Sequence, residues 1–170
     1  LSGDQRDMQN QRRENPMKHL VTAGLLGAMI AAGSVMPMAA NADEMMDNET
    51  VETRQMLMDG IGGAMGTLGC YLKGQCDLPD PVVRNLANGI AFAATAAPNA
   101  FEPKTMDASV KTTADEKIWS DWDGFANRFP ELKKAALAMA SVAGDKAAMG
   151  AAMGDLGKNC KGCHDEYRTK

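Results

Sequence analysis

The stretch GDLGKNCKGCHDEYR, residues 154–168, contains the pattern Cys160-x-x-Cys163-His164. This C-x-x-C-H spacing is the one at which a c-type haem is attached. Two thiols three positions apart lie on one side of a helix, where each can form a thioether to a haem vinyl group. The adjacent imidazole can then bind the iron as an axial ligand. The pattern therefore predicts one covalent haem c on Cys160 and Cys163, with His164 as the proximal iron ligand.

Two other interpretations of these cysteines are open on the residues alone. A structural zinc site would need two further ligands, and Cys70 and Cys76 are the other cysteines of the chain. A thioredoxin-like redox pair expects a strand, a turn and a helix around the motif, and no βαβ pattern is present. Both interpretations are weaker than haem attachment, because the chain also carries an export signal.

The export signal follows a polar stretch, residues 1–16, that has no apolar periodicity and that we expect to be an upstream extension. Residues 17–42 combine a short basic start, an apolar run at 20–35 and a small-x-small triplet, which together predict a signal peptide cleaved before Asp43. A membrane anchor is the alternative, but the apolar run is shorter than the roughly 20 residues that a spanning helix needs. We therefore expect a periplasmic protein with no membrane span after cleavage.

Residues 43–170 have the size of one domain. The net charge of the chain indicates which classes of partner it can bind. The whole chain has a formal net charge of −4, and haem propionates would make it more acidic. Nucleic-acid binding is therefore not expected, and a redox partner with a basic surface fits better. His164 is the single histidine after Asp43, which excludes a bis-histidine haem. A peroxidase is disfavoured because no second histidine can serve as distal acid or base, although an arginine or a carboxylate could take that role. We expect no enzymatic activity.

Four segments show apolar residues at alternating steps of three and four, the spacing of one helix face. The segments are 51–72, 83–97, 118–139 and 149–167. Aromatic content is low and no alternating strand pattern is present. The sequence therefore predicts an all-α fold, an antiparallel four-helix bundle over residues 43–170 with the haem near the C-terminal helix.

The breaks between the segments carry turn residues. Pro81 is suited to the first turn of the second helix, and Gly144-Asp145 to a helix end followed by an N-cap. The longest irregular stretch, residues 98–116, is expected to cross one end of the bundle. Pro130 lies inside the third segment, so a kink or a helix broken near Arg128 is expected.

At this point the sequence resembles the cytochrome c-prime family, including its low-spin relatives, over essentially all of residues 43–170. The matching stretches are TRQMLMDGIGGAMGTLG, EKIWSDWDGF and GDLGKNCKGCHDEYR. The resemblance implies thioether roles for Cys160 and Cys163 and the proximal role for His164. It further implies that Arg168 lies beside that histidine and that Arg54 lies near a haem propionate. Arg54 interrupts an apolar helix face, where a charge needs a partner, although a side chain that snorkels to the surface is the alternative.

Met58 falls at the position that faces the iron on the distal side in this family. The resemblance implies two alternatives, which the residues leave open. In low-spin relatives a methionine here binds the iron and the protein carries electrons, whereas in high-spin members the sixth position is open to small gases such as nitric oxide. Met58 can also be plain core, as methionines at helical spacing usually are. Met65, on the same face, is a second candidate for the pocket. We take single-electron transfer as the expected function, with gas binding as the alternative.

Two further expectations concern the rest of the chain. Cys70 and Cys76 have no counterpart in the family pattern, and in an oxidising compartment they are expected to form a disulfide. The resemblance also implies a possible homodimer through the first two helices. Leu57 and Phe92 are candidates for exposed apolar contacts in it.

Overall fold

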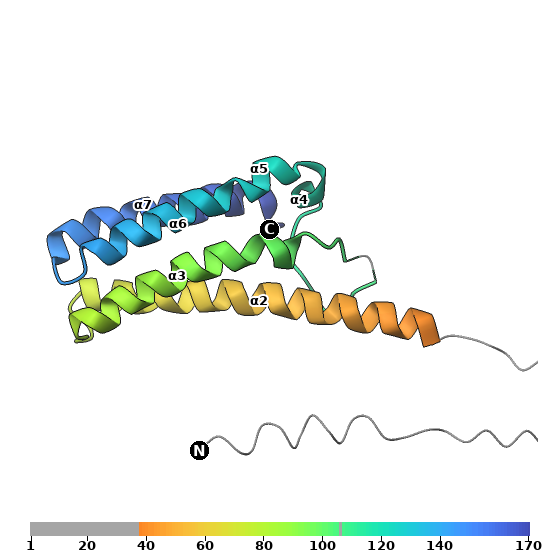
Figure 1. Ribbon diagram of the computed structural model, residues 1–170, viewed down its shortest axis with the longest axis horizontal. Coiled ribbons are helices and arrows are strands. Elements are labelled where there is room, and N and C mark those ends of the chain that lie inside the picture. Colours follow the sequence, from red (N-terminus) through yellow and green to blue (C-terminus); the bar gives the residue numbers. More distant parts are fainter. Residues whose placement is uncertain (1–37, 106) are drawn as a thin grey trace, which may run out of the picture. The chain divides into compact units, whose positions relative to one another are not determined.

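The computed structural model describes residues 38–105 and 107–170, and this part of the chain is helical with no strand (Figure 1). The predicted upstream extension, residues 1–16, and residues 17–37 of the predicted signal peptide, residues 17–42, lie outside the described residues. The helices, in chain order, are α2 (Met38–Leu72), α3 (Asp80–Phe101), α4 (Lys117–Ser120), α5 (Trp122–Ala126), α6 (Arg128–Ser141) and α7 (Lys146–Tyr167).

The four predicted helices are present and pack as an antiparallel bundle. Helix α3 packs against α2 and α6, and α6 packs against α7 (Figure 1). Together α4, α5 and α6 make the third helix of the bundle. The predicted all-α four-helix fold is therefore confirmed. Helix α2 begins at Met38, so it runs through the predicted cleavage position before Asp43.

The third helix is broken at two places, one of which the sequence predicted. The break at Asn127, just before Arg128, agrees with the prediction from Pro130. That proline takes the third position of α6, where a missing backbone N–H leaves no hydrogen bond unmade. The second break lies at Asp121, whose φ of −130° and ψ of 52° leave the helical region. The Asp121 carboxylate accepts a hydrogen bond from the Tyr167 hydroxyl at 2.7 Å, a contact that sequence periodicity does not reveal.

The prediction that irregular structure begins at residue 98 was wrong, because α3 continues through Pro98 to Phe101. Two side chains from elsewhere stabilise its last turn. The Nε atom of Arg54 donates to the Ala100 carbonyl at 2.8 Å, and the indole N–H of Trp119 donates to the Phe101 carbonyl at 2.9 Å. These bonds satisfy carbonyls that a helix end leaves without partners.

The turns at the far end of the bundle agree with the sequence. The Asp145 carboxylate accepts hydrogen bonds from the backbone N–H groups of Ala147 and Ala148, each at 3.0 Å, and so caps α7. Gly144 before it has a φ of +100°, which favours glycine. Pro81 lies in the first turn of α3 as predicted. These local signals fix where two of the helices begin.

Cys70 and Cys76 form the predicted disulfide, with their Cα atoms 5.6 Å apart. The bond closes the turn between α2 and α3. Gly74, at a φ of +68°, allows the chain to reverse there. Neither cysteine lines the cavities described below.

The buried residues form two clusters. The larger is mainly aliphatic and includes Leu68, Ile90, Met139, Met149 and Leu156 among its fully buried members. The second is aromatic, and its buried members are Ala97, Phe101, Ile118, Phe125, Phe129 and Tyr167. Burying side chains of this kind stabilises the fold by roughly 1.5–3 kcal/mol each.

The two residues expected to be exposed and apolar, Phe92 and Leu57, differ in their exposure to solvent. Phe92 on α3 is 76% exposed, as expected. Leu57 is only partly exposed and packs against the aromatic cluster, so the expectation of an exposed side chain was wrong for this residue.

Candidate haem site

Two neighbouring cavities lie where α2 faces α7. The larger has a volume of about 530 Å³ and the smaller about 240 Å³. Both are lined by Met58, Gly62, Phe129, Cys163 and His164. Cavities of 300–1,000 Å³ are typical of cofactor sites. The shared lining indicates that the two cavities are parts of one site.

Helix α7 contributes the cysteine and histidine side chains of this site. Cys160 lines the smaller cavity, while Cys163 and His164 line both. Both cysteines are free thiols and half-buried, and burial raises the pKa of each thiol. Burial, followed by the nearby Arg168 cation, lowers the pKa of His164. These effects favour the neutral imidazole, the form that binds metals.

The methionines of α2 line the opposite wall. Met58 lines both cavities and also packs against both hydrophobic clusters. Met65 lines only the smaller cavity, and like Met58 it packs against the aliphatic cluster. Met58 of α2 and His164 of α7 therefore line the same two cavities from different helices.

Arg54 is 2% exposed and lines the larger cavity, so it does not snorkel to the surface. Besides its bond to Ala100, its Nη1 donates to the Thr105 hydroxyl at 3.1 Å and its Nη2 donates to the Pro103 carbonyl. The guanidinium also lies 5.3 Å from the ring centroids of Phe101 and Trp119. Burial lowers the pKa of Arg54, and Asp47 opposes that shift. The partner that a buried charge requires is thus supplied by the end of α3 and the chain beyond it.

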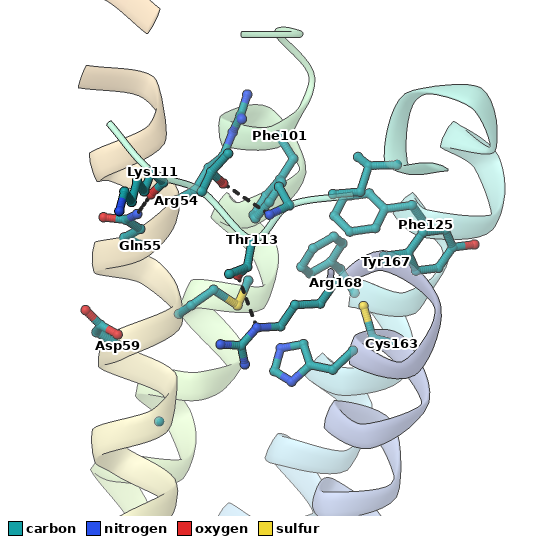
Figure 2. A pocket seen from close by; sticks show the side chains of 17 residues that line it. Arg54, Gln55, Asp59, Phe101, Lys111, Thr113, Phe125, Cys163, Tyr167 and Arg168 are labelled. Atoms are coloured by element: carbon teal, nitrogen blue, oxygen red, sulfur yellow. Dashed lines mark hydrogen bonds between the residues drawn. The ribbon is translucent and has the colours of Figure 1, made fainter. Parts of the chain in front are cut away.

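Residues 102–116, here called the crossing segment, connect α3 to α4 and form one wall of the larger cavity through residues 111–114 (Figure 2). The α2 residue Asn48 holds the segment, because its Oδ1 accepts from the backbone N–H groups of Ser109 and Val110 at 2.8 and 3.0 Å. Gln55 donates to the Lys111 carbonyl at 2.8 Å. The segment therefore crosses the open end of the bundle, as predicted.

Arg168 reaches the cavity in a different way from the one expected. It was placed on the helix face of His164, but α7 ends at Tyr167 and Arg168 is extended, with a φ of −124° and a ψ of 127°. It pairs with Ala114 in an isolated antiparallel bridge, and its Nε donates to the Thr113 hydroxyl at 3.1 Å (Figure 2). Pairing with the crossing segment thus holds Arg168 in an extended conformation, so α7 ends before it. Arg168 still lines the larger cavity.

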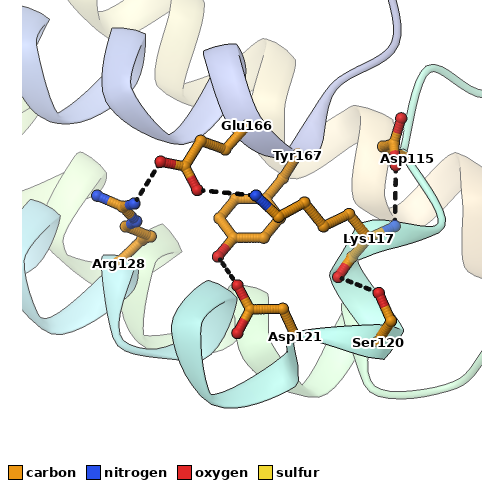
Figure 3. A network of polar contacts seen from close by, with 7 residues as sticks. All are labelled: Asp115, Lys117, Ser120, Asp121, Arg128, Glu166 and Tyr167. Carbon is orange, nitrogen blue, oxygen red and sulfur yellow. Dashed lines mark hydrogen bonds and ion pairs between the residues drawn. The ribbon is translucent and has the colours of Figure 1, made fainter.

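Tyr167 anchors the end of α7 to the third helix (Figure 3). The residue is 4% exposed, and its hydroxyl donates to Asp121. Burial and this hydrogen bond raise the pKa of Tyr167 to about 12. Gly124 makes the contact possible, because a Cβ there would lie 2.7 Å from the Tyr167 hydroxyl. Glu166 beside it binds Lys117 at 3.1 Å and Arg128 at 3.3 Å.

Sequence reasoning missed the aromatic wall of the site. Three of the four phenylalanines, both tryptophans and one of the two tyrosines gather in the aromatic cluster at the larger cavity. Their low number in the sequence hid this concentration. The WSDWDGF stretch, with its two tryptophans and one phenylalanine, was the available signal.

The positions of the cysteines argue against the two other interpretations, a structural zinc site and a thioredoxin-like redox pair. Cys70 and Cys76 are bonded to each other and are not available as zinc ligands. Among the described residues no group of three or more histidine, cysteine or carboxylate side chains converges to hold a metal ion. Cys160 and Cys163 lie within a helix, in a part of the chain that has no sheet. The donor set therefore fits haem attachment, with two free thiols and a half-buried imidazole at one site.

Comparison with known proteins decides the family. The model of the family described as Cytochrome C' matches residues 49–168. The chain belongs to the cytochrome c' family. It is 37% identical over 126 residues to cytochrome c-556 of Agrobacterium tumefaciens, covering 73% of this chain and 98% of the relative. It is 35% identical over 121 residues to cytochrome c' of Rhodospirillum rubrum, covering 70% and 81%.

The bundle is also similar to solved structures of the family. One is the nitric oxide complex of a mutant cytochrome c prime from Alcaligenes xylosoxidans, with a TM-score of 0.64, 26% identity, and coverage of 73% of this chain and 96% of that one. Members of the family bind a single covalently attached haem c, and this chain does so too. Within the described residues, no helix has the length and apolar character needed to cross a membrane.

The bonding of Arg54 predicts the effect of removing its charge. Arg54→Met removes the three donors that hold Ala100, Pro103 and Thr105, so the free energy of unfolding should fall by about 3 kcal/mol. Urea unfolding of the haem-loaded protein measures this change. Arg84→Met is the matched control, because Arg84 is exposed on α3 and its loss should cost less than about 0.5 kcal/mol. Equal effects of the two substitutions would contradict the role of Arg54.

The raised pKa of Tyr167 predicts a loss of stability at high pH. Because its pKa is about 12 in the folded chain and about 10 when unfolded, its contribution is complete below pH 10. It is lost as the pH rises from about 10 to about 12, since the unfolded chain releases the proton first. Thermal unfolding of the parent and of Tyr167→Phe between pH 8 and 11 tests this. The difference in Tm should shrink above pH 10, and a constant difference would argue against the shift.

Proposed function

We propose that the protein is a periplasmic monohaem c-type cytochrome that carries single electrons and is not an enzyme. The observation that best supports this is the lining of the two cavities, where His164 of α7 and Met58 of α2 occur together in both. A methionine and a histidine on opposite walls are the ligand pair of electron-carrying c-type haems, and this pair raises the reduction potential.

In this proposal Cys160 and Cys163 hold the haem through thioethers and His164 is the proximal iron ligand. The bound haem supplies an iron that changes between its ferric and ferrous states by one electron. The protein's part is to hold the imidazole neutral and oriented, and to keep water from the iron with the aromatic wall. Arg168 stands beside His164 in the same lining, and its positive charge disfavours protonation of the imidazole.

The haem carboxylates would find cations at the larger cavity. Arg54, Lys111 and Arg168 all line it, while Asp59 is the one carboxylate of that lining. We assign Arg54 to this end of the haem as well, although three of its donors already bind the end of α3 and the crossing segment. Arg168 uses one donor on Thr113, so the rest of its guanidinium is the stronger candidate for a haem carboxylate.

Gas binding is the second candidate function. It is supported by the structural likeness to the nitric oxide complex of the Alcaligenes xylosoxidans relative. Met58 separates the two functions, since a sixth ligand from Met58 would close the site that a gas needs. The half-buried position of Met58 at both cavities favours ligation.

Export completes the proposal. Residues 17–42 would be removed before Asp43, leaving 43–170 as the mature domain, with residues 1–16 an upstream extension. The remaining part of α2 keeps Asp47, which accepts from the Asp107 backbone N–H at 2.8 Å, and Asn48, so the crossing segment would stay anchored. A homodimer through α2 and α3, with Phe92 at the contact, belongs to the same proposal.

Replacing the motif cysteines tests the covalent attachment. The Cys160→Ser and Cys163→Ser double variant should lose all covalently bound haem, because both thioethers are removed. Mass spectrometry of the denatured protein measures the bound haem. The Cys70→Ser and Cys76→Ser double variant is the matched control and should keep its haem, since that pair forms a disulfide away from the cavities. Retention of covalent haem by the first variant would refute the assignment.

Replacing Met58 tests the choice between the two functions. We expect a low-spin parent that takes up nitric oxide and carbon monoxide slowly, and a high-spin Met58→Ala variant that binds both readily, because the sixth position is then open. Absorption and EPR spectra of the ferric and ferrous protein, with and without each gas, measure this. Met65→Ala is the control and should behave as the parent does. A high-spin parent that binds gas as fast as the variant would instead make gas binding the function.

A further inference from the structure

An unbroken series of aromatic contacts leads from the larger cavity to the surface at α5. Tyr167 and Phe125 line the cavity, and their ring centroids are 5.2 Å apart. Phe125 in turn lies 5.8 Å from Trp122, which is half-buried and so reaches the surface. No other aromatic series leads outward from the cavity in the described part of the chain.

This series matters because electrons tunnel faster through packed atoms than across a gap of the same length. Tyr167 follows His164 by three residues and Cys163 by four, so its ring lies one turn along α7 from the side chains assigned to the haem. The rings of Tyr167, Phe125 and Trp122 therefore form a continuous series of van der Waals contacts between the haem site and solvent. The outer end of this path is the natural place for a redox partner to dock.

The surface at that outer end is acidic. We call it the α4–α5 face, residues 115–126. Its carboxylates include Glu116, whose side chain is 81% exposed, and the exposed Asp121 and Asp123. Its cation, Lys117, binds Glu166 of α7 at 3.1 Å, as does Arg128 beside it at 3.3 Å (Figure 3). These positive charges are paired with α7. Glu116 lies 3.8 Å from the Lys104 amine, but the carboxylates of the face outnumber its cation and give the face its outward charge.

We propose that the α4–α5 face is the docking surface for a redox partner whose own surface is rich in lysine. The inference rests on the electron-carrier function proposed above and adds the place and the chemistry of the contact. Trp122 supplies the kind of aromatic anchor that dominates binding energy in protein interfaces, and the carboxylates around it steer a basic partner to the face. The same face offers the aromatic path inward.

A second acidic surface provides a control. Glu49 and Glu52 are exposed on α2, and neither belongs to the aromatic cluster. Reversing both charges changes the net charge by as much as reversing Glu116 and Asp123. The two double variants, Glu116→Lys with Asp123→Lys and Glu49→Lys with Glu52→Lys, therefore differ in the position of the charge and not in its amount.

The first test is the rate of electron exchange between the haem-loaded protein and a lysine-rich c-type cytochrome, followed by stopped-flow absorption at low salt. We expect Glu116→Lys with Asp123→Lys to lower the second-order rate constant about tenfold and to abolish its fall with added salt. The α2 variant should stay within about twofold of the parent. A loss of rate in the α2 variant alone, or equal losses in both, would overturn the proposal.

The second test reads binding without electron transfer. The chain has two tryptophans, so its indole N–H groups give two resolved NMR signals. On titration with the reduced lysine-rich cytochrome, the Trp122 signal should shift, while that of Trp119, whose N–H is bonded to the Phe101 carbonyl, should shift less. Trp122→Ala should weaken binding, and Trp122→Phe should restore part of it. Unchanged binding in Trp122→Ala would overturn the assignment of this residue.

Dithionite and ferricyanide separate a failure of the docking surface from a failure of the proposed function. These small reagents need no protein interface. If they reduce and reoxidise the haem but the lysine-rich cytochrome exchanges no electrons with the parent, the docking proposal is wrong and the carrier function stands. If neither dithionite and ferricyanide nor the lysine-rich cytochrome can reduce and reoxidise the haem, the carrier function is wrong. The docking proposal is then wrong with it.

Discussion

The buried guanidinium of Arg54 joins three parts of the chain that are far apart in sequence. It lies on α2, binds the last turn of α3 through Ala100, and holds the start of the crossing segment through Pro103 and Thr105. A charge buried without partners would destabilise the fold by several kcal/mol, so these carbonyls and this hydroxyl must stay in place. The end of α3, the path of the crossing segment and the wall of the larger cavity all depend on that requirement.

The crossing segment, which Arg54 holds at its start, in turn binds the C-terminal end of α7. At its far end Ala114 pairs with Arg168, the Asp115 N–H donates to the Tyr167 carbonyl at 3.0 Å, and the Thr169 N–H donates to the Thr113 carbonyl at 2.9 Å. The end of α7 is held from its other side by the Tyr167 bond to Asp121. The helix that carries the haem motif is therefore fixed at its C-terminal end by two independent contacts, which limits how far the imidazole of His164 can move.

Charge and aromatic side chains are distributed unevenly in this chain, in a way that fits the electron-carrier function proposed above. The chain is acidic overall, yet the charged side chains that line the larger cavity are mostly cations, namely Arg54, Lys111 and Arg168. Cations near a haem favour its carboxylates and influence its reduction potential. The aromatic residues are concentrated between that lining and the α4–α5 face, where carboxylates surround Trp122. One end of the bundle thus combines the cofactor site with a polar outer surface.

The sequence by itself determined the helical bundle, the disulfide, the cap at Asp145 and the helix that carries Cys160, Cys163 and His164. Each of these depends on residues close in sequence, whose spacing alone carries the information. Tertiary contacts decided the rest. Helix α3 passes through Pro98 because Arg54 and Trp119 bind its final carbonyls, α7 stops at Tyr167 because the crossing segment pairs with Arg168, and the third helix breaks at Asp121 because that carboxylate binds Tyr167. These donors and acceptors lie at least 18 residues apart, so no local pattern could reveal them.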